Sequence, residues 1–90
     1  MVGESHIASL VVHCRPDRVA SLEGVIAALP GAEVPASDAA GKLVVTLESD
    51  SEQAIARQLE EIGAMTGVLS ATLVFHHVEL PHPPAQGATR

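Results

Sequence analysis

The order of six short segments places the tightest limit on what this chain of 90 residues can fold into. Apolar, β-branched runs typical of strands alternate with segments whose apolar residues recur at helical spacing. The order is strand, helix, strand, strand, helix, strand. The strands are expected at His6–Cys14, Ala32–Ser37, Lys42–Glu48 and Val68–His77, and the helices at Asp17–Leu29 and between Ser49 and Met65.

A proline decides how the strands are arranged. Pro35 lies inside the second strand segment, and because proline cannot donate a ladder hydrogen bond, this strand is expected at an edge. Right-handed crossovers then give a four-stranded antiparallel sheet of order 4-1-3-2 with two helices on one face. The prediction is an α+β domain of the ferredoxin-like βαββαβ type over residues 6–77. Residues 78–90 are rich in proline and lack periodicity, so they are predicted to form a disordered tail.

Composition narrows the possible partners and compartments. The aromatic fraction is 1% and the formal net charge is −6, whereas proteins that bind single-stranded nucleic acid need stacking aromatics and a basic groove. Nucleic-acid binding is therefore not expected, and the acidic balance favours a cationic partner. Cys14 is the only cysteine, so no disulfide framework is expected. With neither a signal peptide at the N-terminus nor a run approaching the ~20 apolar residues that span a bilayer, a cytoplasmic protein without membrane insertion is predicted.

Strand alternation sorts the side chains between the helix-covered face of the sheet and the opposite, open face. The inward set is expected to be Ala8, Leu10, Val12, Leu43, Val45, Leu47, Leu69, Ala71, Leu73 and Phe75. The open face is expected to carry Ile7, Ser9, Val11, His13, Lys42, Val44, Thr46, Glu48, Val68, Ser70, Thr72, Val74 and His76. Valine, serine and threonine occupy its centre, which predicts a low, semi-apolar surface on which a helix or an extended peptide docks. The alternative is that valine and threonine occur there only because they form strands well.

The residues that commonly carry chemistry do not combine into a site. His76 and His77 are neighbours on a strand and point to opposite faces, and no CxxC motif supports a metal site with His13. Neither a metal nor a cofactor is predicted, and Cys14 is expected to be a structural thiol. Arg15 precedes the first helix, as the phosphate-binding arginine of acylphosphatases does, but the chain has no asparagine to orient water. Catalysis is therefore not expected.

Five segments of the chain closely resemble the NapD family. They are Ser9–Val12, Leu29–Val34, Ser37–Asp38, Gly41–Val45 and Gly67–His76. The most specific combination is the Leu-Pro-Gly turn, the Ser-Asp hairpin and the long last strand that ends in histidine. The resemblance implies a cytoplasmic chaperone that binds the twin-arginine signal peptide of the catalytic subunit of periplasmic nitrate reductase as a helix on the sheet. It also implies that export is held back until the cofactors of that subunit are inserted.

The resemblance and the open face together predict helix-on-sheet capture of this signal peptide. The binding residues are expected to be Ser9, Val11, Val44, Thr46, Glu48, Ser70, Thr72 and Val74. Glu48, and secondarily Glu33, are the candidates to hold the arginines. Two alternatives stay open: a regulatory small-ligand domain of the ACT-like kind, with its ligand near Arg15 to Arg18, and a metallochaperone, against which the missing CxxC motif counts.

Overall fold

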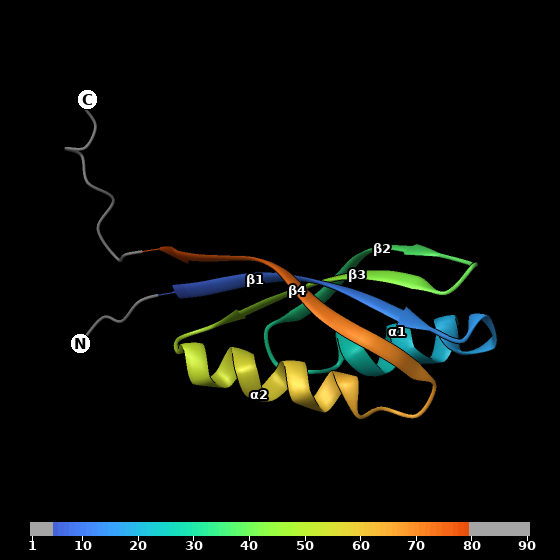
Figure 1. Cartoon of the computed structure of the whole chain (residues 1–90). Helices are drawn as coiled ribbons and strands as arrows, with labels where there is room; N and C mark the ends of the chain where they lie inside the picture. The colour runs from blue at the N-terminus through green and yellow to red at the C-terminus, as the bar shows by residue number, and fades with distance from the viewer. Residues whose placement is uncertain (1–4, 80–90) are drawn as a thin grey trace.

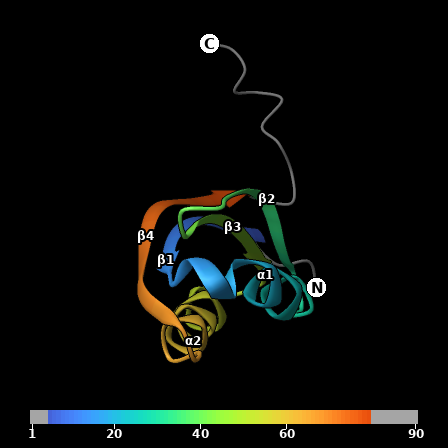
Figure 2. The same cartoon turned by 90° about the vertical axis from the view of Figure 1, so that its right-hand side faces the viewer.

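The computed structural model describes residues 5–79. Its elements are β1 (Ser5–Cys14), a 3-10 turn (Pro16–Arg18), α1 (Val19–Ala27), β2 (Ala32–Asp38), β3 (Lys42–Ser49), α2 (Glu52–Gly63) and β4 (Val68–Glu79). The strands form one antiparallel sheet of order β2-β3-β1-β4, which is the predicted order counted from the other edge. Both helices lie side by side on one face of it (Figure 1, Figure 2). The predicted ferredoxin-like α+β fold is thus confirmed.

Local signals set the helix ends. The first helical segment opens with a 3-10 turn because Pro16 fixes its own φ and lacks an N–H that would need a partner. The cap of α2 is Ser51, whose Oγ accepts a hydrogen bond from the Ala54 N–H at 3.1 Å. A serine cap of this kind satisfies one of the N–H groups that a helix leaves unpaired in its first turn.

An aliphatic core joins the sheet to the helices. The central strands and the helices supply its fully or almost fully buried side chains: Ala8, Leu10 and Val12 from β1, Leu43, Val45 and Leu47 from β3, Leu22 and Ile26 from α1, and Ile55 and Ile62 from α2. Burial of each large side chain contributes roughly 1.5–3 kcal/mol. The alternation predicted for both central strands is therefore confirmed.

β4 departs from simple alternation at a bulge in its second half. Ser9 lies opposite Phe75, but the next residue of β1, Leu10, lies opposite Leu73, so Val74 is an extra residue without a register partner. Because a bulge shifts the alternation by one residue, Phe75 shares the face of Ser9 rather than the face of Leu10. Phe75 was predicted to point inward, and this prediction was wrong.

A second bulge lies near the start of β4. His13 pairs with Ser70 and Cys14 pairs with Val68, which leaves Leu69 as the extra residue. Val68 consequently packs against the core instead of facing the open side, and Leu69, predicted to be inward, is exposed. His76 also changes face. It pairs with the buried Ala8, and residues paired across a ladder share a face, so His76 lies on the helix side of the sheet. Its prediction as an open-face residue was also wrong.

The buried His6 fixes the position of His76. The Nδ1 of His6 and the Nε2 of His76 are 3.0 Å apart, and the ring centroids are 5.2 Å apart. One imidazole therefore donates and the other accepts, so the pair ties the start of β1 to the second half of β4.

The second strand lies at an edge, as Pro35 required, and its register against β3 shifts between Glu33 and Ala36, on either side of this proline. At the other end of the domain, β4 continues through Val78 and Glu79, beyond the strand end expected from the sequence. The rest of the predicted disordered tail, 80–90, lies outside the described residues.

Candidate functional site

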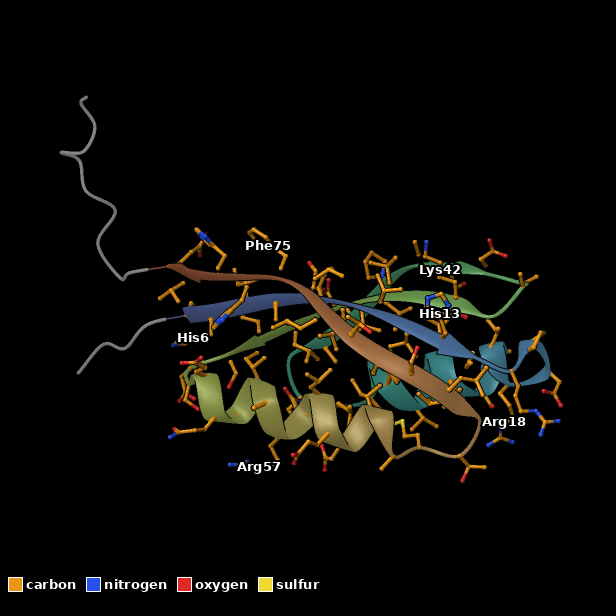
Figure 3. All side chains as sticks on the ribbon, in the orientation of Figure 1. His6, His13, Arg18, Lys42, Arg57 and Phe75 are labelled. Carbon is orange, nitrogen blue, oxygen red and sulfur yellow. The ribbon has the colours of Figure 1, made fainter. Side chains whose placement is uncertain are left out.

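The open face is the side of the sheet turned away from both helices, and strand register defines its rows. From one end to the other, the rows are Asp38, Lys42, His13 and Ser70; then Ala36, Val44, Val11 and Thr72; then Glu33, Thr46, Ser9 and Phe75; then Glu48, Ile7 and His77. Figure 3 shows the labelled side chains of His13, Lys42 and Phe75 on this side, with Arg57 on the outer surface of α2.

The centre of the open face is a low floor of small side chains. Val44 and Thr46 of β3 and Ser9 and Val11 of β1 are half-buried, because each lies between neighbouring strands and is short. The only polar groups among these four side chains are the hydroxyls of Ser9 and Thr46. This surface can therefore accept apolar side chains and can also form hydrogen bonds through the two hydroxyls.

The structure brings seven of the eight predicted binding residues to this face: Ser9, Val11, Val44, Thr46, Glu48, Ser70 and Thr72. Val74 is the exception, since it is the extra residue of the bulge in the second half of β4 and is 58% exposed. Whether these residues contact a guest stays a prediction.

Phe75 and His77 are the open-face residues of β4 that alternation missed, and Phe75 is the apolar one. It is 55% exposed and stacks against His77, with ring centroids 6.1 Å apart and ring planes 12° apart. Among the described residues, the large exposed apolar side chains gather on β4, apart from Val25 of α1. The sequence held one signal of this: Phe75 is the only phenylalanine, in a chain without tryptophan or tyrosine, and aromatic side chains contribute strongly to interfaces as well as to cores.

An acidic hollow lies at one end of the open face. It measures about 190 Å³ and is lined by Ile7, Gly31, Ala32, Glu33, Thr46, Leu47 and Glu48. The Oε2 of Glu48 accepts a hydrogen bond from the Ser5 hydroxyl at 3.1 Å. Two carboxylates on one hollow favour a guanidinium or an ammonium group, because charge-assisted hydrogen bonds to ionised acceptors are the strong ones.

Gly31 shapes this acidic hollow through the backbone. Its φ of 75° lies in the left-handed region, and its carbonyl oxygen accepts a hydrogen bond from the Glu48 N–H at 2.9 Å. A Cβ at this position would collide with the Glu48 carbonyl oxygen. Glycine is therefore required here for both its conformation and its size, and it lets the loop after α1 approach the end of β3.

The opposite end of the open face has a different charge. Lys42 and the paired His13 are exposed there, next to a hollow of about 210 Å³ lined by Ala36, Ser37, Asp38, Lys42 and Val44. Asp38 closes the hairpin turn, because its Oδ1 accepts a hydrogen bond from the Ala40 N–H at 2.7 Å.

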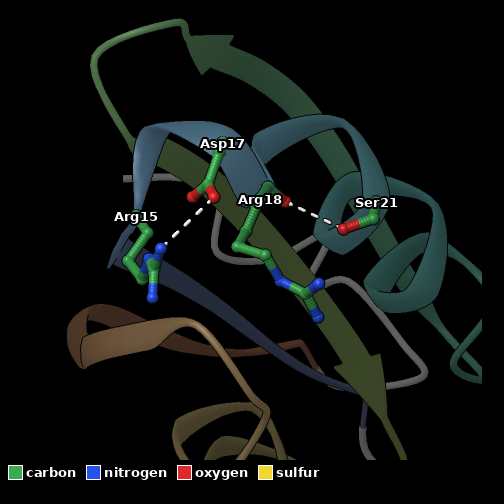
Figure 4. Close-up of polar contacts among 4 residues, drawn as sticks. All are labelled: Arg15, Asp17, Arg18 and Ser21. Atoms are coloured by element: carbon green, nitrogen blue, oxygen red, sulfur yellow. Dashed lines mark hydrogen bonds and ion pairs between the residues drawn. The ribbon is translucent and has the colours of Figure 1, made fainter.

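The two arginines before α1 differ in their contacts. Arg15 forms an exposed ion pair with Asp17, Nη2 to Oδ2 3.3 Å, and the Ser21 hydroxyl donates to the Arg18 carbonyl at 3.2 Å (Figure 4). The side chain of Arg18 lies against Gly67, where a Cβ would come within 2.7 Å of its Cγ. The ligand site of the ACT-like alternative falls on these residues. The Arg18 N–H donates to the Arg15 carbonyl at 2.9 Å, whereas the side-chain Nε of Arg18 is buried without a hydrogen-bond partner among the described residues.

Cys14 is the remaining reactive residue. It is 3% exposed at the end of β1. Burial raises the pKa of its thiol, and the negative charge of Asp17 raises it further. The predicted structural role fits this environment, since a thiol held protonated is a poor nucleophile.

Residues 5–79 contain no group of three or more histidine, cysteine, aspartate or glutamate side chains placed to hold a metal ion. In the same part of the chain, every helix is too short or too polar to cross a membrane.

Comparison with known proteins agrees with the architecture. The sequence model of the family described as "NapD protein" matches residues 5–80. The chain is 34% identical to the Chaperone NapD of Escherichia coli (strain K12) over 74 residues, covering 81% of this chain and 85% of the relative. It is 46% identical to the Chaperone NapD of Paracoccus pantotrophus over 79 residues, covering 84% of this chain and 70% of the relative.

A solved structure is similar over nearly the whole chain. It is the solution structure of the E. coli Tat proofreading chaperone protein NapD, with a TM-score of 0.79 and 30% identity, covering 93% of this chain and 90% of that one. The relatives are named as chaperones, which supports the prediction that this protein is not an enzyme. On the family match and these identities, the chain belongs to the NapD family of chaperones.

Proposed function

We propose that this protein binds the twin-arginine signal peptide of an exported client on its open face, in the cytoplasm. We further propose that the client is the catalytic subunit of a periplasmic nitrate reductase, and that binding holds back its export until its cofactors are inserted. The similarity to a Tat proofreading chaperone supports the class of guest. The observation that carries the proposal is an open, semi-apolar floor that ends in an acidic hollow.

The floor suits the apolar stripe of a short helix. Val11 and Val44 form its centre, and Phe75 stands at its β4 side. The small side chains of Ser9 and Thr46 permit close approach of a helix backbone. Covering ~600 Å² of apolar surface at ~25 cal/mol per Å² gives ~15 kcal/mol before the cost of ordering the peptide. That cost removes much of the gain, so affinity between micromolar and nanomolar is expected.

The acidic hollow suits the arginines of the guest. Glu33 and Glu48 both line it, and the Ser5 hydroxyl orients one oxygen of Glu48 while leaving the carboxylate exposed. A guanidinium offers planar donors that match a carboxylate. The net charge of −6 adds long-range attraction for a basic peptide.

The test is an NMR titration of the isotopically labelled protein with a twin-arginine signal peptide, together with calorimetry on one pair of variants. Shifts are expected at open-face residues and not at α1 or α2. Val44→Glu should abolish binding with the fold intact, because it places a charge in the centre of the floor. Val25→Glu makes the same change at an exposed valine of α1 and should bind normally. Unchanged affinity of Val44→Glu, or shifts concentrated on the helices, would refute the open-face site.

A further inference from the structure

Resting on the proposed function, we propose that the guest helix binds in one direction only, parallel to β1. Its N-terminal arginines lie over the acidic hollow at Glu33 and Glu48, and its C-terminal end lies over Lys42 and His13. The open face therefore selects a guest by the order of charges along its helix as well as by their presence.

The first observation is that the formal charges of the open face are separated along its length. Glu33 and Glu48 lie at the end where β1 begins, and Lys42 lies with His13 at the end where β1 finishes. Asp38 also lies near Lys42 in the register, but one of its carboxylate oxygens is engaged by the Ala40 N–H in the turn. The negative charge of Asp38 offsets the positive charge of Lys42, so this end is formally near neutral, whereas the other end carries the carboxylates of Glu33 and Glu48.

The second observation is that a helix has a polarity that matches this separation. Its N-terminal end carries a partial positive charge and its C-terminal end a partial negative charge. In the proposed direction the helix dipole and the arginines both favour the same placement, with the positive end over the carboxylates and the last carbonyl groups over Lys42. In the reverse direction, both contributions become unfavourable at once.

The third observation concerns length. Glu48 and Lys42 are six residues apart on β3, which corresponds to ~20 Å at ~3.3 Å per residue. An α-helix rises ~1.5 Å per residue, so about 13 residues connect the two ends. Val44 and Val11 lie between them, opposite the middle turns of such a helix. The guest is therefore defined as a helix of three to four turns with an arginine pair at its start and apolar residues in its middle.

A charge reversal tests the direction by the sign of its effect. In Lys42→Glu, the proposed direction places the new carboxylate under the C-terminal end of the helix, so binding should weaken by about threefold. In the reverse direction the same carboxylate would meet the arginines and tighten binding. Arg57→Glu, on the outer surface of α2 (Figure 3), makes the same change in net charge away from the open face and corrects for long-range attraction.

Spin labels on the guest give the direction independently. A twin-arginine peptide carries a nitroxide at its N-terminal or its C-terminal end and is added to the isotopically labelled full chain. The N-terminal label should broaden Ile7 and Glu48, and the C-terminal label should broaden His13 and Lys42. Interchanged broadening, equal broadening from both labels, or tighter binding of Lys42→Glu than of Arg57→Glu would overturn the proposed direction while leaving open-face binding in place. Failure of the unlabelled peptide to shift any open-face signal would instead refute the proposed function.

Discussion

Phe75 of β4 lies directly opposite Ser9 of β1, so the one phenylalanine of the chain stands on the open face beside one of its smallest side chains. This pairing exists because Val74 is an extra residue in the strand. The aromatic ring then forms a raised side to the floor made by Val11 and Val44, and a guest helix on that floor would rest against it.

Phe75→Ala should weaken signal-peptide binding by about tenfold, because a half-exposed ring contributes more to a partner than to the core. The free energy of unfolding should change by less than about 1 kcal/mol. Calorimetry with the peptide and urea unfolding measure the two effects. Val25→Ala removes an equally exposed apolar side chain from α1 and should leave binding unchanged. A loss of several kcal/mol in stability without loss of affinity would assign Phe75 to the fold.

Glu48→Gln should lower the affinity for the signal peptide and reduce its dependence on salt, since a charge-assisted contact to arginine is screened by ions. Glu33→Gln should act in the same direction, because both carboxylates line the acidic hollow. The measurement is calorimetry at low and at high ionic strength. Glu61→Gln, at an exposed position of α2, provides the control for the change in net charge. An effect of the same size at both ionic strengths would argue against an arginine in the hollow.

Gly31→Ala should destabilise the fold by about 1–3 kcal/mol, because alanine is strained at positive φ and its Cβ would collide with the Glu48 carbonyl oxygen. It should also weaken peptide binding, since the displaced backbone belongs to the acidic hollow. Gly24→Ala is the matched control: this glycine lies within α1, and a Cβ there would have no neighbouring atom within 4 Å. That variant should be more stable than the parent by about 0.5–1 kcal/mol. Urea unfolding of both variants checks the opposite signs.

Stability should fall at alkaline pH through Cys14. Burial and the nearby Asp17 raise the pKa of the folded thiol above its ordinary value of 9.0. Deprotonation thus favours the unfolded chain: the stabilising contribution is complete below the unfolded pKa and is lost as pH rises through the folded one. Urea unfolding over this range should show the fall, and Cys14→Ala should reduce it. An identical pH dependence in both proteins would exclude Cys14 as its source.

The central strands and one edge could be predicted from the sequence because each has a single strong signal. Leu43, Val45 and Leu47 alternate without interruption, and Pro35 can lie only where no partner needs its N–H. β4 could not be predicted in this way, because Leu69 and Val74 are apolar residues indistinguishable from their neighbours. Only the pairing with β1 reveals that they are extra, and each one inverts the faces of the residues that follow.

The candidate site could likewise be predicted from the sequence only in part. The floor residues on β1 and β3 follow from alternation, whereas the acidic hollow depends on distant parts of the chain. Glu33 follows the Gly31 turn and Glu48 lies near the end of β3, and the hydrogen bond from the Glu48 N–H to the Gly31 carbonyl holds these segments together beyond the last register pair of β2 and β3. A backbone contact of this kind leaves no periodic trace in the sequence, so the two glutamates could be named individually but not placed on one hollow.

The irregularities at the sheet margins also decide what kind of guest can be accepted. An extended peptide that joins a sheet needs a continuous run of evenly spaced backbone groups on an outer strand. β2 interrupts that run at Pro35, and β4 interrupts it at the bulges of Leu69 and Val74. Prolines and bulges on edge strands are features by which natural sheets avoid pairing with added strands. Strand addition is thereby disfavoured at both margins. A ligand whose own backbone hydrogen bonds are already satisfied, as in a helix, needs none of these groups and can lie on the open face of the sheet instead.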